Sequence, residues 1–227
     1  MKIAGIQKLS LVDFDGHISS TIFTSGCNFA CAFCHNSSLI PNNSDLLKID
    51  DIFDFLQKRK NMLDSVCITG GEPTLHNDLP DFISKIKNMG YLVKLDTNGT
   101  NPQMIEYLVE NKLIDYIAMD IKNTPEKYTP IIQLKTNEDN IKKSIKYIMN
   151  CGIDYEFRTT LINEYHTIND IVEIGKLIKN ANKYFLQKFV DNDNCLTRNL
   201  TEISKATALE MQEKIKKYIP NTFLRGY

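Results

Sequence analysis

Three cysteines in the first part of the chain have the spacing of a metal-binding loop. Cys27, Cys31 and Cys34 follow one another as Cys-x3-Cys-x2-Cys, directly after a short apolar run. Three thiolates so close in sequence converge only if the loop wraps around a common centre. Soft thiolate ligands favour an iron–sulfur cluster. A [4Fe–4S] cluster held by three cysteines has one open iron, which can bind a substrate.

The same residues fit three other kinds of site less well. Cys31 to His35 also reads as Cys-x-x-Cys-His, the attachment pattern of haem c, and three cysteines with His35 have the ligand types of structural zinc. A redox Cys-x-x-Cys pair would leave Cys27 without a role. Haem attachment requires export, but the chain begins without the apolar run of a signal peptide. Zinc sites usually have two separated ligand pairs. We therefore predict a cluster, with a non-enzymatic zinc or haem module as the alternative.

Polar residues follow the next apolar runs and add to the candidate site. Gly70-Gly71-Glu72-Pro73 comes after the run at 65–69, and its glycines allow close backbone approach to a ligand, although a tight turn has the same residues. Asp120 and Lys122 are two residues apart and share one face of an extended segment, as a salt bridge or as a binding pair. The remaining candidates lie at or near the ends of three further runs: Asp96, Thr97, Arg158 and Gln187.

Alternating strands and helices are needed to bring these candidates together. Short runs rich in Val, Ile, Phe and Tyr predict strands at Ile18–Phe23, Ser65–Thr69, Tyr91–Leu95, Tyr116–Met119, Ile153–Thr159 and Lys183–Val190. Longer amphipathic stretches predict helices at Ser44–Arg59, Asn77–Met89, Pro102–Asn111, Asn137–Asn150, Thr167–Asn180 and Thr201–Tyr218. Such alternation implies an α/β fold with a parallel sheet and helical crossovers. Both a doubly wound sheet and a barrel bind ligands beyond the C-terminal ends of their strands.

Length and charge limit the other classes of function. The 227 residues carry a net charge of −1 without a basic stripe, so nucleic acid is not expected as a partner. No stretch reaches about 18 apolar residues, so no membrane span is expected. Without a signal peptide the chain is expected in the reducing cytoplasm, where Cys67, Cys151 and Cys195 are predicted to be core or surface thiols. We expect a single domain over residues 1–227, and a monomer, because no coiled coil or exposed apolar stripe is evident.

Taken together, the motifs resemble the radical S-adenosylmethionine (SAM) superfamily. That family's signature is Cys-x3-Cys-x-aromatic-Cys after a first strand, here with Phe33 at the aromatic position. The resemblance covers the chain from about Leu11 to Val190. It implies a partial (β/α)6 TIM-like barrel of the radical SAM type. It also implies a [4Fe–4S] cluster on the three cysteines that reductively cleaves SAM.

The resemblance further implies which residues contact SAM. In the family the aromatic residue lies against the adenine, and the Gly-Gly-Glu-Pro segment holds the amino group of the methionine part. Asp96, Thr97 and Asp120 resemble residues of glycyl-radical activating enzymes that contact SAM and partly hold a monovalent cation. Arg158 resembles the arginine at the SAM site. The full set of expected SAM contacts is Phe33, Gly70, Gly71, Glu72, Pro73, Asp96, Thr97, Asp120, Lys122, Arg158 and Gln187, the last with a ligand or the backbone as its partner.

Two segments narrow the resemblance to one reaction. Leu11–His17 and Cys34-His35-Asn36 resemble the activating enzymes of glycyl-radical proteins, and most of all the activating protein of anaerobic ribonucleoside-triphosphate reductase. That family usually has Pro where this chain has Asp15, which makes the loop less rigid. The implied partners are a glycyl-radical enzyme and a flavodoxin or ferredoxin electron donor. The alternative is a radical SAM enzyme acting on a small molecule, such as 7-carboxy-7-deazaguanine synthase.

Overall fold

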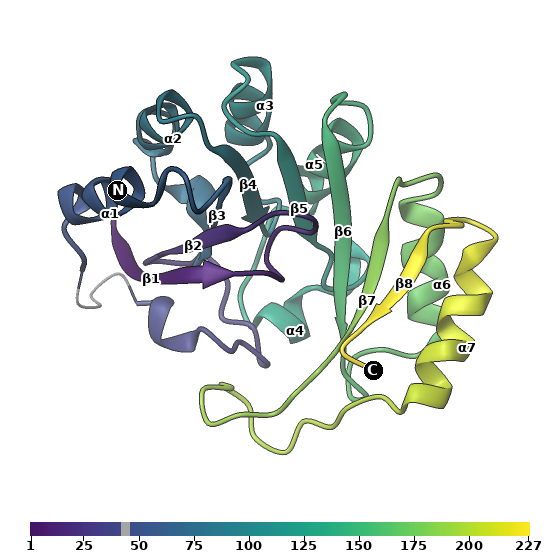
Figure 1. Ribbon diagram of the computed structural model, residues 1–227. Coiled ribbons are helices and arrows are strands. Elements are labelled where there is room, and N and C mark those ends of the chain that lie inside the picture. The colour runs from purple at the N-terminus through teal and green to yellow at the C-terminus, as the bar shows by residue number, and fades with distance from the viewer. Residues whose placement is uncertain (42–45) are drawn as a thin grey trace.

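An eight-stranded sheet organises the protein, whose computed structural model describes residues 1–41 and 46–227 (Figure 1). The strands lie side by side in chain order, from β1 to β8. The first pair is antiparallel and all later neighbours are parallel. The strands are β1 (Ile3–Ser10), β2 (Ser19–Thr24), β3 (Ser65–Gly70), β4 (Leu92–Thr97), β5 (Tyr116–Asp120), β6 (Asp154–Leu161), β7 (Tyr184–Lys188) and β8 (Thr222–Arg225).

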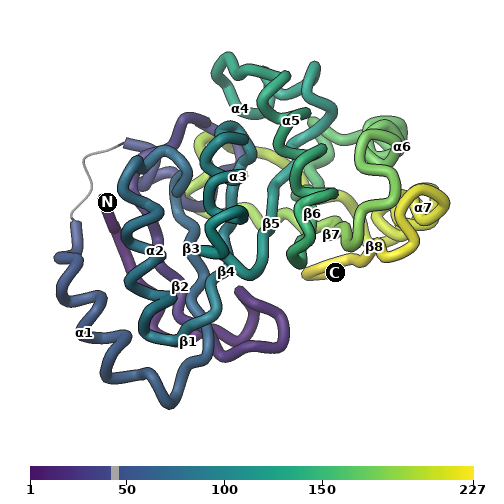
Figure 2. Tube along the Cα trace, turned by 90° about the horizontal axis from the view of Figure 1, so that it is seen from above, coloured from purple at the N-terminus to yellow at the C-terminus, as the bar shows by residue number. Residues whose placement is uncertain are grey.

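The helices connect successive parallel strands and lie outside the curved sheet (Figures 1 and 2). Right-handed crossovers between strands in sequential order place every connecting helix on one face, so the sheet curls into a partial barrel. The longer helices are α1 (Ile49–Arg59), α2 (Leu79–Asn88), α3 (Pro102–Glu110), α5 (Glu138–Ile148), α6 (Ile168–Leu177) and α7 (Lys205–Lys216). The shorter ones are α4 (Thr129–Ile132) and the 3-10 helices η1 (Ser37–Leu39), η2 (Pro73–Leu75) and η3 (Pro125–Lys127).

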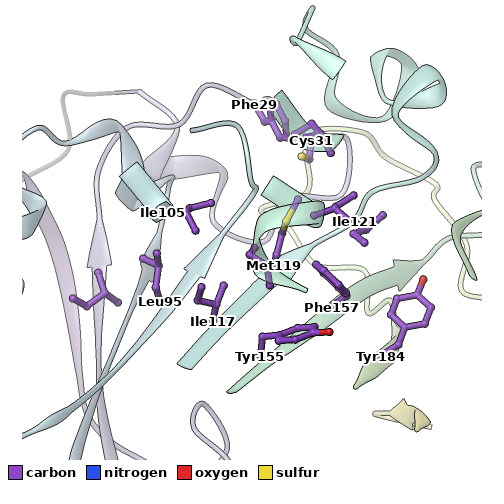
Figure 3. Close-up of a cluster of buried hydrophobic side chains, with 14 of the residues drawn as sticks. Phe29, Cys31, Leu95, Ile105, Ile117, Met119, Ile121, Tyr155, Phe157 and Tyr184 are labelled. Atoms are coloured by element: carbon purple, nitrogen blue, oxygen red, sulfur yellow. The ribbon is translucent and has the colours of Figure 1, made fainter. Parts of the chain in front are cut away.

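The apolar core lies between the strands and these helices. Leu95, Ile117, Met119 and Phe157 come from three neighbouring strands, are fully buried, and gather in one cluster (Figure 3). Burying a side chain of this size stabilises the fold by roughly 1.5–3 kcal/mol. Cys31 belongs to the same core, so the cysteine loop is packed onto the body of the protein.

The predicted α/β partial barrel is confirmed, with two strands that the sequence pattern did not reveal. All six predicted strands are present, but β1 and β8 extend the sheet at its two edges. The first helix begins at Ile49 instead of Ser44; Ser44 and Asp45, where its start was predicted, lie outside the described residues. The last helix begins at Lys205, capped by the Ser204 side chain. Within the described part of the chain, no helix is long and apolar enough to cross a membrane.

Candidate active site

The C-terminal ends of β3 to β6 and the cysteine loop after β2 border one cavity, where the sequence predicted the ligands to lie. The predicted site residues that line it are Cys27, Cys31, Phe33, Cys34, Gly70, Gly71, Glu72, Asp96, Thr97, Asp120, Lys122 and Arg158. Pro73 and Gln187 are not among the lining residues. Pro73 is buried at the start of η2. Gln187 is half-buried on β7 and is paired in register with Arg225, so the structure does not place it at the cavity.

The two glycines at the end of β3 hold the cysteine loop against the sheet. The amide of Gly71 donates to the Thr24 carbonyl, and the amide of Glu72 donates to the Gly26 carbonyl, both at 2.8 Å. Gly70 has a φ of +112°, and a Cβ at Gly71 would lie 2.1 Å from the Gly26 carbonyl oxygen. No larger residue fits at that contact. The sequence suggested glycines that admit a ligand; their closest neighbour is the backbone just before Cys27.

The short helix α4 and a distant loop hold the rest of the cysteine loop. The amides of Ala30 and Ala32 donate to the carbonyls of Ile132 and Ile131. The Ala32 carbonyl in turn accepts from the Thr197 amide at 2.8 Å. Since these bonds satisfy the loop's backbone between the cysteines, the loop keeps its shape through contacts with the protein.

Burial disfavours ionisation of the three thiols. Burial raises the pKa of Cys27 to about 12 and that of Cys31 to about 11, and it also raises the pKa of Cys34. Binding to iron deprotonates a thiol outright. Among the described residues, no group of His, Cys, Asp and Glu side chains forms a site for a single metal ion. Three half-buried or buried thiols spread around one cavity fit a multi-iron cluster, in which each cysteine binds a different iron.

Glu72 joins the loop after β3 to the loop after β4. Its fully buried carboxylate accepts hydrogen bonds from the amide and hydroxyl of Thr74, the hydroxyl of Thr97 and the amide of Asn98. Burial raises the pKa of Glu72, and these four bonds oppose the rise by favouring the ionised form. The side chain therefore shapes the cavity wall, in addition to facing the cavity.

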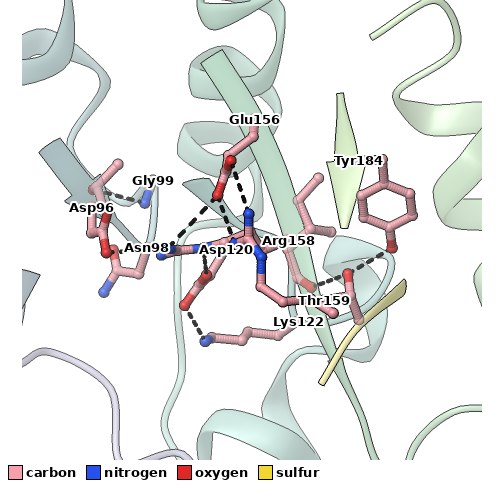
Figure 4. Close-up of polar contacts among 12 residues, drawn as sticks. Asp96, Asn98, Gly99, Asp120, Lys122, Glu156, Arg158, Thr159 and Tyr184 are labelled. Carbon is pink, nitrogen blue, oxygen red and sulfur yellow. Dashed lines mark hydrogen bonds and ion pairs between the residues drawn. The ribbon is translucent and has the colours of Figure 1, made fainter. Parts of the chain in front are cut away.

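Two aspartates and two basic residues form a chain of ion pairs along the cavity (Figure 4). Arg158 donates from Nε to Asp120 Oδ1 at 2.9 Å and from Nη1 to Asp96 Oδ2 at 3.1 Å. Lys122 Nζ donates to Asp120 Oδ2 at 2.9 Å and lies 5.3 Å from the centre of the Phe33 ring. Burial would raise the pKa of Asp120, but Lys122 and Arg158 hold it below its usual value. Charged side chains thus line the cavity in fixed positions.

Several residues of this region were missed by the sequence reading. Asn98, His35, Asn36 and Thr160 also line the cavity. Glu156 is not a lining residue; its Oε1 lies 4.0 Å from Nη1 of Arg158, and 1% of its side chain is exposed. Lys94 lies beside Asp96 and is also buried. Lys94 and Glu156 could have been found from the sequence, because each is a charged residue between two apolar or aromatic neighbours within a predicted strand. A buried charge needs a partner of opposite charge, so such residues indicate an ion pair.

A comparison with protein-family models matches residues 21–178 to the Radical SAM superfamily. The chain belongs to the radical SAM superfamily. This membership implies a [4Fe–4S] cluster and SAM, and the cavity supplies the thiols and charged groups for both. This radical SAM protein is 36% identical to a Methanocaldococcus jannaschii protein that is named as a glycyl-radical enzyme activating enzyme. The match covers 98% of this chain and 95% of the relative's chain. A second protein of that organism, similarly named, is 29% identical over 88% and 78% of the two chains.

Solved structures confirm the radical SAM fold. Streptococcus suis SuiB bound to precursor peptide SuiA superposes with a TM-score of 0.72 at 18% sequence identity. The match covers 91% of this chain but only 48% of SuiB, so the chain spans about half the length of that protein. At this identity the likeness establishes the fold alone.

Proposed function

We propose that this radical SAM protein is an activating enzyme that generates a glycyl radical on a partner protein, with anaerobic ribonucleoside-triphosphate reductase as the favoured partner. The observation that carries the proposal is that the three cysteines and the ion-paired side chains line one and the same cavity. Relatives named as glycyl-radical enzyme activating enzymes, matched over nearly their whole length, support the reaction class. The segments Leu11–His17 and Cys34-His35-Asn36 support the reductase as partner.

When bound by the three cysteines, a [4Fe–4S] cluster with an open iron supplies the electron that cleaves SAM into methionine and a 5′-deoxyadenosyl radical. Lys122 and Arg158 place positive charge beside the cavity for the SAM carboxylate, and Asp120 holds both basic groups in place. Phe33 offers its ring to the adenine. Gly70 and Gly71 line the cavity with backbone alone, which leaves room for the SAM ammonium group near Glu72.

No cavity residue needs to act as a base, because the hydrogen of the partner's glycine moves as an atom. The demand on the protein is to position SAM and to exclude water while the radical exists. The partner must present its glycine on a loop that enters the cavity. We place the enzyme in the cytoplasm as a monomer, reduced by a flavodoxin or ferredoxin. These three assignments extend the sequence expectations.

The decisive experiment measures two products. The protein is reconstituted with iron and sulfide without oxygen, given dithionite and SAM, and mixed with an anaerobic ribonucleoside-triphosphate reductase. We expect 5′-deoxyadenosine by chromatography and a glycyl radical by electron paramagnetic resonance. A variant with Cys27, Cys31 and Cys34 changed to Ala is expected to give neither, and a reductase lacking its radical glycine is expected to give no radical.

The outcomes separate the parts of the proposal. Nucleoside formation with no radical on the reductase, but with one on another glycyl-radical enzyme, contradicts only the choice of partner. Nucleoside formation coupled to a change in a small molecule favours the 7-carboxy-7-deazaguanine synthase type of reaction. A protein that carries a full cluster but binds no SAM contradicts the proposal as a whole.

A further inference from the structure

One buried carboxylate oxygen beside the cavity has no hydrogen bond within the described part of the chain. It is Oδ1 of Asp96, whose other oxygen accepts from Arg158. Burying an ionised oxygen without a partner is costly, so an opposite charge must lie near it. The Lys94 ammonium does so, with 3.6 Å between Nζ and Oδ1.

Lys94 is fixed in a way that directs its charge to this oxygen. It stands two residues before Asp96 on β4, and alternate residues of a strand share one face. Only 4% of its side chain is exposed. Its ammonium also donates to the backbone carbonyl of Asp13 and lies 5.5 Å from the centre of the Tyr116 ring. A lysine held by a carbonyl and a ring is a permanent part of the site.

The neighbouring carboxylate of Asp120 already has two cations. Both oxygens of Asp120 are bonded, one to Arg158 and one to Lys122. Four basic side chains, Lys94, Lys122, Arg158 and Arg225, form ion pairs with the three carboxylates Asp96, Asp120 and Glu156. These carboxylates are therefore not short of positive charge as they stand. A free cation at Asp96 would add a charge and would approach the Lys94 ammonium, which repels it.

We infer that Lys94 supplies to Asp96 the positive charge that the family resemblance assigns to a monovalent cation, so that SAM binding by this chain needs no such ion. The inference rests on the proposed function, because it takes SAM to bind beside Asp96 and Asp120. Lys94 is a positioning residue in this arrangement: it fixes Asp96, and Asp96 fixes one end of the Arg158 guanidinium.

The test compares SAM affinity in different salts. The reconstituted protein is titrated with SAM by calorimetry without oxygen, in potassium, sodium or tetramethylammonium chloride at one ionic strength. The wild-type affinity is expected to change by less than about twofold. In Lys94→Met we expect an affinity about 30-fold weaker in tetramethylammonium, the loss typical of an uncompensated buried charge, with most of it recovered in potassium.

Lys183→Met is the matched control. The Lys183 ammonium lies 5.7 Å from the same Tyr116 ring, but it makes no ion pair with the cavity aspartates in the described structure. This variant is expected to bind SAM like the wild type in all three salts. Thermal unfolding of each variant identifies any variant that fails to fold. In that case the comparison of wild-type SAM affinity in the three salts decides whether the inference holds.

Each outcome has one meaning. A wild-type affinity that rises more than about fivefold in potassium or sodium overturns the inference and leaves the proposed function intact. A folded Lys94→Met protein that stays insensitive to the salt also overturns it. Absence of SAM binding in every salt, with a full cluster present, contradicts the proposed function itself.

Discussion

The charged side chains at the cavity are held in place mainly by ion pairs with one another. Asp120 shows this most clearly, because Arg158 and Lys122 each bind one of its oxygens. Both basic groups are almost fully enclosed, with 13% and 12% of their side chains exposed. Removing the shared carboxylate would leave two enclosed cations with one partner fewer each. The paired acid thus stabilises the unliganded protein as well as serving the ligand.

Asp120→Asn is therefore expected to destabilise the protein at pH 7. We expect a loss of about 2 kcal/mol in the free energy of unfolding, below the usual loss for a broken buried pair because the carboxylate is partly exposed. Burial opposes the shift, but Lys122 and Arg158 lower the folded pKa of Asp120. The stability from the pair is thus fully present above the pKa of an unfolded aspartate and is lost as the pH falls through the folded pKa.

Urea unfolding of the cluster-free protein at several pH values measures this effect. The difference between wild type and Asp120→Asn should be constant from pH 8 down to about pH 5 and should shrink at more acidic pH. Asp115→Asn, which breaks a partly exposed pair with Lys87 outside the cavity, serves as the control for the loss of a carboxylate elsewhere. A difference for Asp120→Asn that widened on acidification would contradict the assignment.

At the scale of elements, the turn after β3 decides whether the cysteine loop forms. Gly71→Ala would place a methyl group 2.1 Å from the Gly26 carbonyl oxygen, and the backbone on both sides would have to move. We expect a destabilisation of about 3 kcal/mol and loss of most of the iron bound after reconstitution. Iron and sulfide analysis per protein, with unfolding curves, measures both.

Gly5→Ala is the control for that change. A Cβ at Gly5 meets only the Phe23 side chain at 3.9 Å, an ordinary contact on the adjacent strand pair. It is expected to bind as much iron as the wild type and to lose less than about 0.5 kcal/mol. Equal iron content in the Gly71→Ala and Gly5→Ala variants would show that Gly71 does not set the shape of the cysteine loop.

The same elements show what the sequence could and could not predict. Parallel strands bring their C-terminal ends to one edge, so sequence order alone predicted that residues after the apolar runs, such as Glu72 and Asp120, lie near one another, and both line the cavity. β8 is only four residues long, too short for a periodic pattern. The ion pair of Lys94 with Asp96 and the contact of Gly71 with Gly26 depend on how strands pack, which the spacing of residues does not contain.

On the scale of the whole molecule, the curved sheet is open, and its two edges are joined by side chains. Arg225 on the last strand bonds Glu156 on β6 at 3.1 Å and reaches Asp15, in the loop after β1, at 3.4 Å. Asp15 is the residue that stands where the resembled family usually has Pro. The loop after the first strand is thereby connected to the last strand, on the side of Glu156 that faces away from the cavity.

The two contacts of Arg225 are expected to contribute very differently to stability. Only 1% of the Glu156 side chain is exposed, against 58% for Asp15. Among the described residues, Arg225→Met leaves Glu156 with the Tyr116 hydroxyl at 3.1 Å as its hydrogen-bond donor and with Arg158 at 4.0 Å, so we expect a loss of about 3 kcal/mol in unfolding free energy. Asp15→Asn breaks an exposed pair and is expected to cost less than about 0.5 kcal/mol.

Urea unfolding of both variants and of the double variant tests this order. The double variant should match Arg225→Met closely, because Asp15 acts only through Arg225. Since Glu156 also lies near Arg158, Arg225→Met is further expected to weaken SAM binding, whereas Asp15→Asn is not. Equal and small losses in the two single variants would contradict this order. Hydrogen bonding between the strands would then be enough to hold the open barrel. Asp15 would affect the rigidity of its loop instead of the closure of the barrel.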